Sequence, residues 1–425
     1  MKISKIVYRM NAVLALLLLA GMSSLASAGE ANGKKIVFTT KSKEAQDYVV
    51  QAVRAIESFQ GQQVQALAQK AVDADPNFAF AHYLVGVFQP PPQGKPHFDK
   101  ATELAKNASE GERRYLEAIF LNRNQQPDKA LVIFKELGQQ YPEDRMVRMM
   151  IGQLSVAGKD LDTAQAAFEK ASQIDGSTPR VHTFLGNVNL LKGNYAKARE
   201  YYKTALSKKV DGVAPFGPHT GLAYAYVYEG DVSSAIKTME NYEAEYERTG
   251  GPQNFPAVFI WNAIGRLLLE NGKPEESIKA YEKGYATIPG SSLPDLEKKT
   301  WLGRLHHGKG RALAKMGKHE EAWKEAELIK QMIDENGEAG KAFMPSYHYI
   351  AGYVKLESGD YAAAVEHMKQ SDLTDPFHKL LLARAYEKSG DTANAQKVYK
   401  EIVESTDINL ERALSYPEAK KKFKG

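Results

Sequence analysis

The residues best placed to do chemistry lie in one short stretch beyond residue 300. Gly303, Gly308 and Lys309 have the spacing of a phosphate-binding loop, in which backbone N–H groups and a lysine hold phosphate oxygens. The next position is Gly310, where that motif needs Ser or Thr to hold magnesium. The stretch is also expected inside a helix, whereas the motif needs a strand before it and a helix after it. We therefore interpret it as helical structure and not as a nucleotide site.

Three histidines in the same region raise the question of a metal. His306 and His307 are adjacent, so on a helix they point about 100° apart and do not converge on one ion by themselves. His319 begins a sequence that lacks the second histidine of a zinc protease motif. The chain has no cysteine, which excludes thiol nucleophiles and thiolate ligands. We expect no catalytic residues, no metal and no cofactor.

The elements that position these residues follow a fixed period. Ala130, Ala164 and Ala198 lie 34 residues apart, and each has an aromatic residue four positions later. Gly152 and Gly186 lie twelve residues before the second and third of these alanines. A period of 34 with small residues in one register predicts a solenoid of helical hairpins, in which the glycine and alanine let two helices approach closely.

The turns between the two helices of each hairpin carry a second signal. Each turn contains a glycine followed by a polar residue. Glycine suits the left-handed conformation that ends a helix. These pairs are Gly158-Lys159, Gly193-Asn194, Gly230-Asp231, Gly272-Lys273, Gly317-Lys318, Gly359-Asp360 and Gly390-Asp391.

This pattern resembles the tetratricopeptide repeat. Its best units are RMVRMMIGQLSVAGKDLDTAQAAFEKASQID from Arg145 and PRVHTFLGNVNLLKGNYAKAREYYKTALS from Pro179. The segment FTTKSKEAQDY from Phe38 is also similar to the opening of a group of exported bacterial repeat proteins. The resemblance implies an all-α fold, a right-handed α-solenoid superhelix of helical hairpins, with ligands in a concave groove lined by the first helix of each unit.

Two positions of the first helices give the candidate binding residues. The ninth and fifth positions of a unit fall on one helical face, and in the later units they are polar, aromatic or arginine. The candidates are Asn187, Tyr224, Asn262, Arg266, His307, Arg311, Tyr349, Tyr353 and Arg384. Arginine holds carboxylates in a bidentate fashion, so an anionic group is one expected ligand. The alternative is that these arginines form salt bridges between neighbouring helices.

The resemblance offers one specific ligand class that this chain does not match. Some members hold a peptide C-terminus with a lysine at the fifth position, and no unit here has a lysine there. Two hypotheses remain. The first is a non-catalytic scaffold that binds a protein or peptide partner within a cell-envelope complex. The second is a binder of an acidic small molecule or glycan.

The N-terminus predicts export. Residues 1–28 combine basic residues, an apolar centre and the sequence Ala26-Ser27-Ala28, the three parts of a signal peptide. Three of the 56 basic residues lie in this segment, so the mature chain carries 53 against 52 acidic residues and has no excess charge for nucleic acid. We expect an extended lead at 29–43, about ten repeat units at 44–408, and a capping helix with a basic tail at 409–425. The expected location is periplasmic or secreted, in a bacterium.

Overall fold

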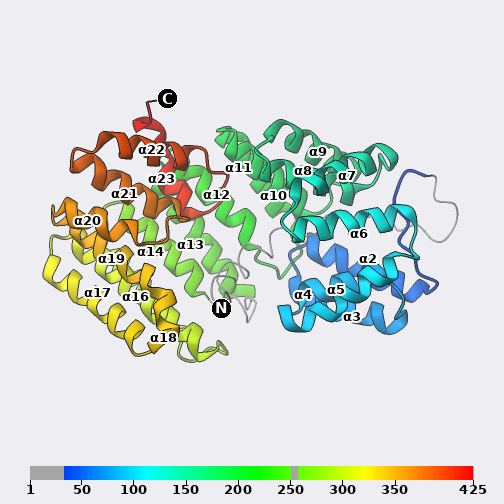
Figure 1. The fold of residues 1–425 in the computed structure, drawn as a ribbon, viewed down its shortest axis with the longest axis horizontal. Coiled ribbons are helices and arrows are strands. Elements are labelled where there is room, and N and C mark those ends of the chain that lie inside the picture. The colour runs from blue at the N-terminus through cyan, green and yellow to red at the C-terminus, as the bar shows by residue number, and fades with distance from the viewer. Residues whose placement is uncertain (1–32, 250–256, 425) are drawn as a thin grey trace. The chain divides into compact units, whose positions relative to one another are not determined.

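The computed structural model describes residues 33–249 and 257–424, and the regular elements within these ranges are all helices (Figure 1). The all-α prediction is therefore confirmed for the described chain. The predicted signal segment lies outside it. In the described ranges no helix combines the length and apolarity needed to cross a bilayer.

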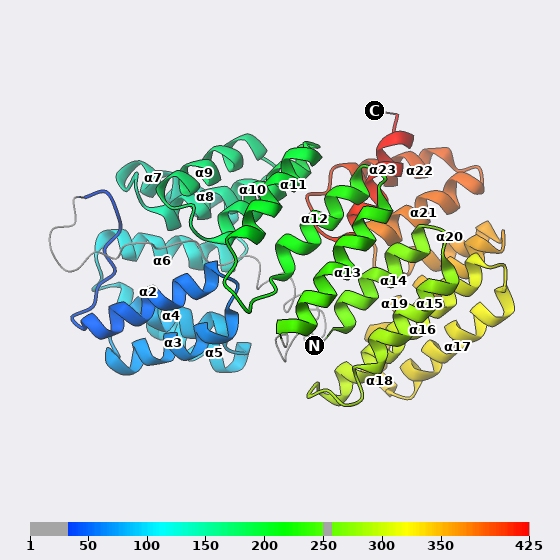
Figure 2. The same ribbon diagram turned by 180° about the vertical axis from the view of Figure 1, so that it is seen from behind.

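The helices pair in chain order as neighbouring hairpins. The structure divides by contacts into two compact units, an N-terminal unit of residues 33–218 and a C-terminal unit of residues 219–424 (Figures 1 and 2). The N-terminal unit contains α2 Lys43–Glu57, α3 Gly61–Ala74, α4 Ala79–Phe88, α5 Pro91–Ala105, α6 Glu110–Arg123, α7 Pro127–Gln140, α8 Arg145–Ala157, α9 Leu161–Ile174, α10 Pro179–Leu191 and α11 Tyr195–Ser207. Helix α12 Phe216–Tyr228 begins at the boundary. The C-terminal unit continues with α13 Val232–Thr249, α14 Val258–Glu270, α15 Pro274–Ala286, α16 Asp295–Lys315, α17 His319–Asp334, α18 Gly337–Gly340, η2 Lys341–Phe343, α19 Met344–Glu357, α20 Tyr361–Lys369, α21 Pro376–Lys388, α22 Thr392–Val403 and α23 Leu410–Lys422.

The repeating glycines make room for an aromatic ring. A Cβ atom at Gly152 would lie 2.5 Å from Cε1 of Phe168, and one at Gly186 would lie 2.6 Å from Cε1 of Tyr202. These rings stand four residues after the small residue of the second helix. The sequence interpretation, in which glycine faces alanine, is therefore incomplete. The glycine in each first helix receives the ring that follows the alanine in the second, and this sets how closely the two helices pack.

The turns follow the predicted chemistry with one exception. Gly230 and Gly390 have φ of 82° and 87°, the left-handed conformation that the turn requires. In the turn of Gly158 and Lys159 the roles are exchanged, because Gly158 has φ −80° and Lys159 has φ 63°. A side chain is thus held in a conformation that favours glycine, and this turn carries backbone strain that the other two do not.

An extended segment at the start of the N-terminal unit contacts its first four hairpins. Phe38 is 2% exposed and packs against Phe80 of α4, with ring centroids 4.2 Å apart. The backbone N–H of Ile36 donates to Asp144 Oδ2 at 3.0 Å, and that of Thr39 donates to Glu112 Oε2 at 2.6 Å. Thr40 Oγ1 donates to Asp75 Oδ2 at 2.5 Å, and Ser109 Oγ donates to the carbonyl of Val37 at 2.6 Å. The segment is thus part of the core of this unit.

Glu112 makes the attachment of this segment sensitive to pH. Burial raises the pKa of Glu112 to about 7, and the N–H of Thr39 lowers it only in part. The folded state therefore keeps the proton that the unfolded state loses near pH 4.5, so stability falls as pH rises from about 4.5 to about 7. We expect Glu112→Gln to remove a pH-dependent loss of up to about 3 kcal/mol over this range. Urea titrations at several pH values measure it.

The control for this prediction is Glu110→Gln, an exposed carboxylate in the first turn of the same helix. This variant should keep the pH dependence of the unaltered chain. Parallel stability curves for the unaltered chain and Glu112→Gln between pH 4.5 and 7 would contradict the assignment.

Candidate functional site

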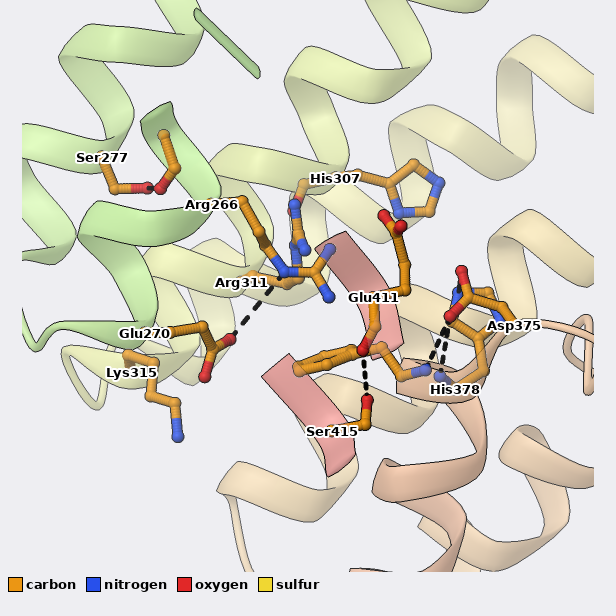
Figure 3. A network of polar contacts seen from close by, with 12 residues as sticks. Arg266, Glu270, Ser277, His307, Arg311, Lys315, Asp375, His378, Glu411 and Ser415 are labelled. Carbon is orange, nitrogen blue, oxygen red and sulfur yellow. Dashed lines mark hydrogen bonds and ion pairs between the residues drawn. The ribbon is translucent and has the colours of Figure 1, made fainter. Parts of the chain in front are cut away.

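The first helices of the C-terminal unit bring most of the predicted binding residues together. Tyr224 lies on α12, Asn262 and Arg266 on α14, His307 and Arg311 on α16, Tyr349 and Tyr353 on α19, and Arg384 on α21. All except Asn262 and Arg384 are at least nine-tenths buried. Figure 3 shows Arg266, His307 and Arg311 directed to one region, which Glu411 of α23 also enters. We call Arg266, Arg311, Arg384 and their contacts the arginine face.

Asn187 does not belong to this group. It lies on α10 in the N-terminal unit, and its Oδ1 accepts a hydrogen bond of 2.8 Å from the hydroxyl of Tyr202 on the paired helix. The amide thus holds the ring that fills the space above Gly186. The structure gives Asn187 a packing role within its own hairpin.

Asn262 lies beside a small cavity. The cavity has a volume of about 10 Å³ and is also lined by Tyr281, Trp301 and Arg304. A space of this size holds about one water molecule. It therefore offers no room for an organic ligand.

Arg311 has all three guanidinium nitrogens engaged. Its Nη1 donates to the hydroxyl of Tyr349 at 2.9 Å, its Nη2 to the hydroxyl of Tyr281 at 3.0 Å, and its Nε to the carbonyl of His307 at 3.1 Å. The side chain bridges three helices, α15, α16 and α19, and is 4% exposed. These contacts are those of a residue that connects neighbouring helices.

Arg266 is buried with its hydrogen-bonding capacity largely unused. It is 8% exposed and lies 3.9 Å from the ring centroid of Phe377, in a cation–π contact. Its Nε is 3.9 Å from Glu270 Oε1, which is an ion pair but too long for a hydrogen bond. Nε and Nη2 of Arg266 and Oε1 of Glu270 have no hydrogen-bond partner in the described chain. Buried polar groups are almost always satisfied in folded proteins, so this arginine stands out.

The histidines beside the arginine face are neutral near pH 7. Burial lowers the pKa of His378 to about 3, helped by the charge of Arg266, and burial also holds the pKa of His307 well below its usual range. The ring of His378 stacks on that of Tyr349 at 3.9 Å. The cations of this face are therefore its arginines and not its imidazoles.

A serine–histidine contact in this region does not form a catalytic triad. His307 Nε2 lies 2.6 Å from Ser346 Oγ, while its Nδ1 has no partner in the described chain to orient the ring. Its lowered pKa makes it a weak base. His306 turns to Glu325 instead, with Nδ1 2.6 Å from Oε2. The two adjacent histidines thus point to different partners, as their spacing predicts.

Carboxylates of α23 lie against the arginine face. Arg384 Nη2 donates to Glu418 Oε2 at 2.6 Å, and its Nε lies 3.1 Å from Glu418 Oε1. Glu411 is partly buried; burial raises its pKa, the charge of Asp375 adds to that rise, and the charge of Arg266 opposes it only in part. The two glutamates are seven residues apart, two helical turns, and so share one face of α23. The expected anionic group is here supplied by the chain itself.

Further contacts of α23 extend to the first helix of the unit. Arg412 Nη1 donates to the hydroxyl of Tyr228 at 2.5 Å, and the rings of Tyr228 and Tyr416 lie 5.5 Å apart. The capping helix and basic tail predicted for residues 409–425 leave these acidic residues out. The signal that was available is the spacing of Glu411 and Glu418 on one helical face.

Comparisons with known proteins identify a repeat family in three segments of the chain. Residues 149–213, 220–292 and 379–405 match family profiles described as tetratricopeptide repeat. No curated protein matches the sequence significantly.

Among solved structures, a chain of the APC/C hetero-tetramer Cut9-Hcn1 is 14% identical, with 84% of this chain and 55% of that chain covered and a TM-score of 0.43. The present chain thus spans little more than half the length of that relative. A tetratricopeptide repeat protein from Parabacteroides merdae is 15% identical, covering 62% of this chain and 99% of that one at a TM-score of 0.37. Human IFIT1, in a dimer with PPP-AAAA, is 14% identical over 85% of this chain and 90% of its own, with a TM-score of 0.42. The chain therefore contains tetratricopeptide repeats over these matched residues, and its paired helices have the hairpin arrangement of that repeat.

Proposed function

We propose that this protein is an exported, non-catalytic bacterial scaffold that binds a protein or peptide partner within a cell-envelope complex. The fold fits a role in protein interaction in general, because stacked hairpins present extended helical surfaces. The observation that carries the proposal is the arginine face, which already engages a helix through the ion pair of Arg384 with Glu418, while the charge of Glu411 lies close enough to act on Arg266. Of the predicted residues, we propose that Arg266 and Arg384 contact the partner.

The test is crosslinking in the source cells followed by purification of the protein from the envelope fraction. We expect one or a few proteins in stoichiometric amount, and a lower yield from Arg384→Gln, whose side chain is partly exposed and bears the charge in question. N-terminal sequencing of the purified protein should begin at Gly29. Recovery of no protein partner would contradict the scaffold role, recovery of an acidic glycan alone would favour the alternative, and a start at Met1 would show a retained anchor.

Arg311 provides a prediction that separates binding from stability. We expect Arg311→Ala to lower the free energy of unfolding by about 2–4 kcal/mol, because it leaves the buried hydroxyls of Tyr281 and Tyr349 without their donor. Partner yield should not change once it is corrected for the folded fraction. Lys299→Ala, an exposed residue of the same helix, is the control and should alter neither quantity. A loss of partner with unchanged stability would instead place Arg311 in the binding surface.

A further inference from the structure

Helix α23 buries less apolar surface in the C-terminal unit than the first helix before it does. Its fully buried apolar side chains are small, Ala413 and Ala419, whereas the preceding first helix α21 buries Phe377, Leu380 and Leu381. Burial of apolar area is the main source of packing energy, so α23 gains less of it than α21 does. Leu414 and Phe423 pack partly buried against the core of the unit, and charged pairs and one hydrogen bond to α12 add to this attachment.

The sequence of α23 also weakens the helix itself. Pro417 lies inside it, where proline removes a backbone hydrogen bond and crowds the preceding turn. A six-residue connection, 404–409, links it to α22, so α23 is a terminal element on a short tether. Such elements open at lower free energy than the rest of a domain.

The fit between α23 and the face beneath it is incomplete. Arg266 keeps two nitrogens without a hydrogen bond, and Arg412 Nε is likewise unsatisfied in the described chain. A buried donor without an acceptor is destabilising, and a carboxylate placed to accept its hydrogen bond would remove that cost. Glu411 approaches Arg266 without a hydrogen bond between the two among the described contacts (Figure 3). The arginine face could therefore hold a carboxylate at Arg266 in a hydrogen bond that α23 does not provide.

From these contacts we infer that the arginine face is the docking surface for an acidic helix of the partner, and that α23 is an internal competitor which the partner displaces. The inference rests on the proposed function. The occupant is a helix with two carboxylates two turns apart, the spacing of Glu411 and Glu418 in α23, so that one carboxylate pairs with Arg384 and the other reaches Arg266. Charge complementarity selects this occupant, because both arginines are cationic and the neighbouring imidazoles are neutral.

The test uses the full chain and a fluorescein-labelled peptide of residues 406–424 as the probe. In the unaltered chain the tethered α23 has an effective concentration near the millimolar range, so micromolar peptide should bind hardly at all. In the chain with Glu411→Gln and Glu418→Gln the competitor is weakened, and the same peptide should bind roughly tenfold or more tightly. A peptide carrying the same two substitutions should not bind. The control chain carries Glu320→Gln and Glu321→Gln, two exposed carboxylates of α17.

Hydrogen exchange distinguishes release of α23 from unfolding of the whole C-terminal unit. In the doubly substituted chain, the amides of α23 should exchange faster while those of α14, α16 and α19 remain protected. Equal peptide binding by the unaltered and substituted chains, or loss of protection throughout the C-terminal unit, would show that α23 is a structural cap and overturn the inference. A dimer in light scattering would mean that a second copy of the chain occupies the face, which also overturns it.

The two proposals fail in different ways. If a protein partner copurifies in equal yield with the unaltered and the doubly substituted chain, and no peptide exchange occurs, the partner binds elsewhere and only this inference falls. If the substituted chain binds the peptide but no protein copurifies from the envelope, the proposed function falls.

Discussion

Replacing Glu57 with alanine is expected to lower the free energy of unfolding of the N-terminal unit by about 3–5 kcal/mol. Glu57, at the end of α2, forms an ion pair with Arg145 at the start of α8, and both side chains are at most 2% exposed. The hydroxyl of Thr178 donates to Glu57 Oε2 at 3.3 Å. Burial lowers the pKa of neighbouring Arg180 to about 10, and Glu57 opposes that shift. The substitution leaves two guanidinium groups buried with their nearest carboxylate removed.

Urea denaturation of the full chain, followed by circular dichroism, measures this effect. Glu44→Ala, an exposed carboxylate in the first turn of the same helix, is the matched control and should change stability by no more than about 0.5 kcal/mol. Similar losses for the two variants would show that the buried ion pair is not a stabilising centre.

The second large effect is expected at Phe38, which lies outside every helix. Phe38→Ala should cost about 3–5 kcal/mol, the usual range for removing a buried phenylalanine ring. The ring packs on Phe80 and Tyr115, with centroids 4.2 and 5.9 Å away. Its loss should also release the amides of Ile36 and Thr39, which are bonded to Asp144 and Glu112. Denaturation and hydrogen exchange report these two consequences separately.

Val37→Ala is the control for Phe38, because the neighbouring side chain is 47% exposed. It should leave both stability and amide protection nearly unchanged. If Phe38→Ala behaves in the same way, the extended segment is not part of the core.

The helices and their register could be predicted from the sequence because the repeat is local. Each hairpin is specified within about 34 residues by small residues at the crossing and by glycine in the turn. Gly186 and the ring of Tyr202, which fills the space beside it, are only sixteen positions apart, so both belong to one repeat unit and their contact follows from the repeat pattern. Lys159 departs from this rule, since nothing in its local pattern distinguishes it from the residues that follow glycine in other turns.

The state of the arginine face could not be predicted, because periodicity gives the face of a helix but not what covers it. Arg384 meets Glu418 across 34 residues, and Arg412 meets Tyr228 across 184. Such contacts depend on how far each hairpin rotates relative to the last, and small rotations accumulate along an array. The same limit applies to Phe38, whose partners lie on α4 and α6.

The hydrogen bond between Arg412 and Tyr228 has a consequence for how the C-terminal unit comes apart. In an array whose repeats contact only their sequence neighbours, each end can unfold independently, and loss of one repeat destabilises only the repeat beside it. Here the last helix also contacts the first, so opening at either one removes this hydrogen bond from the other. The two ends of the unit are therefore coupled while α23 is in place, and once α23 is released each end can open without affecting the other.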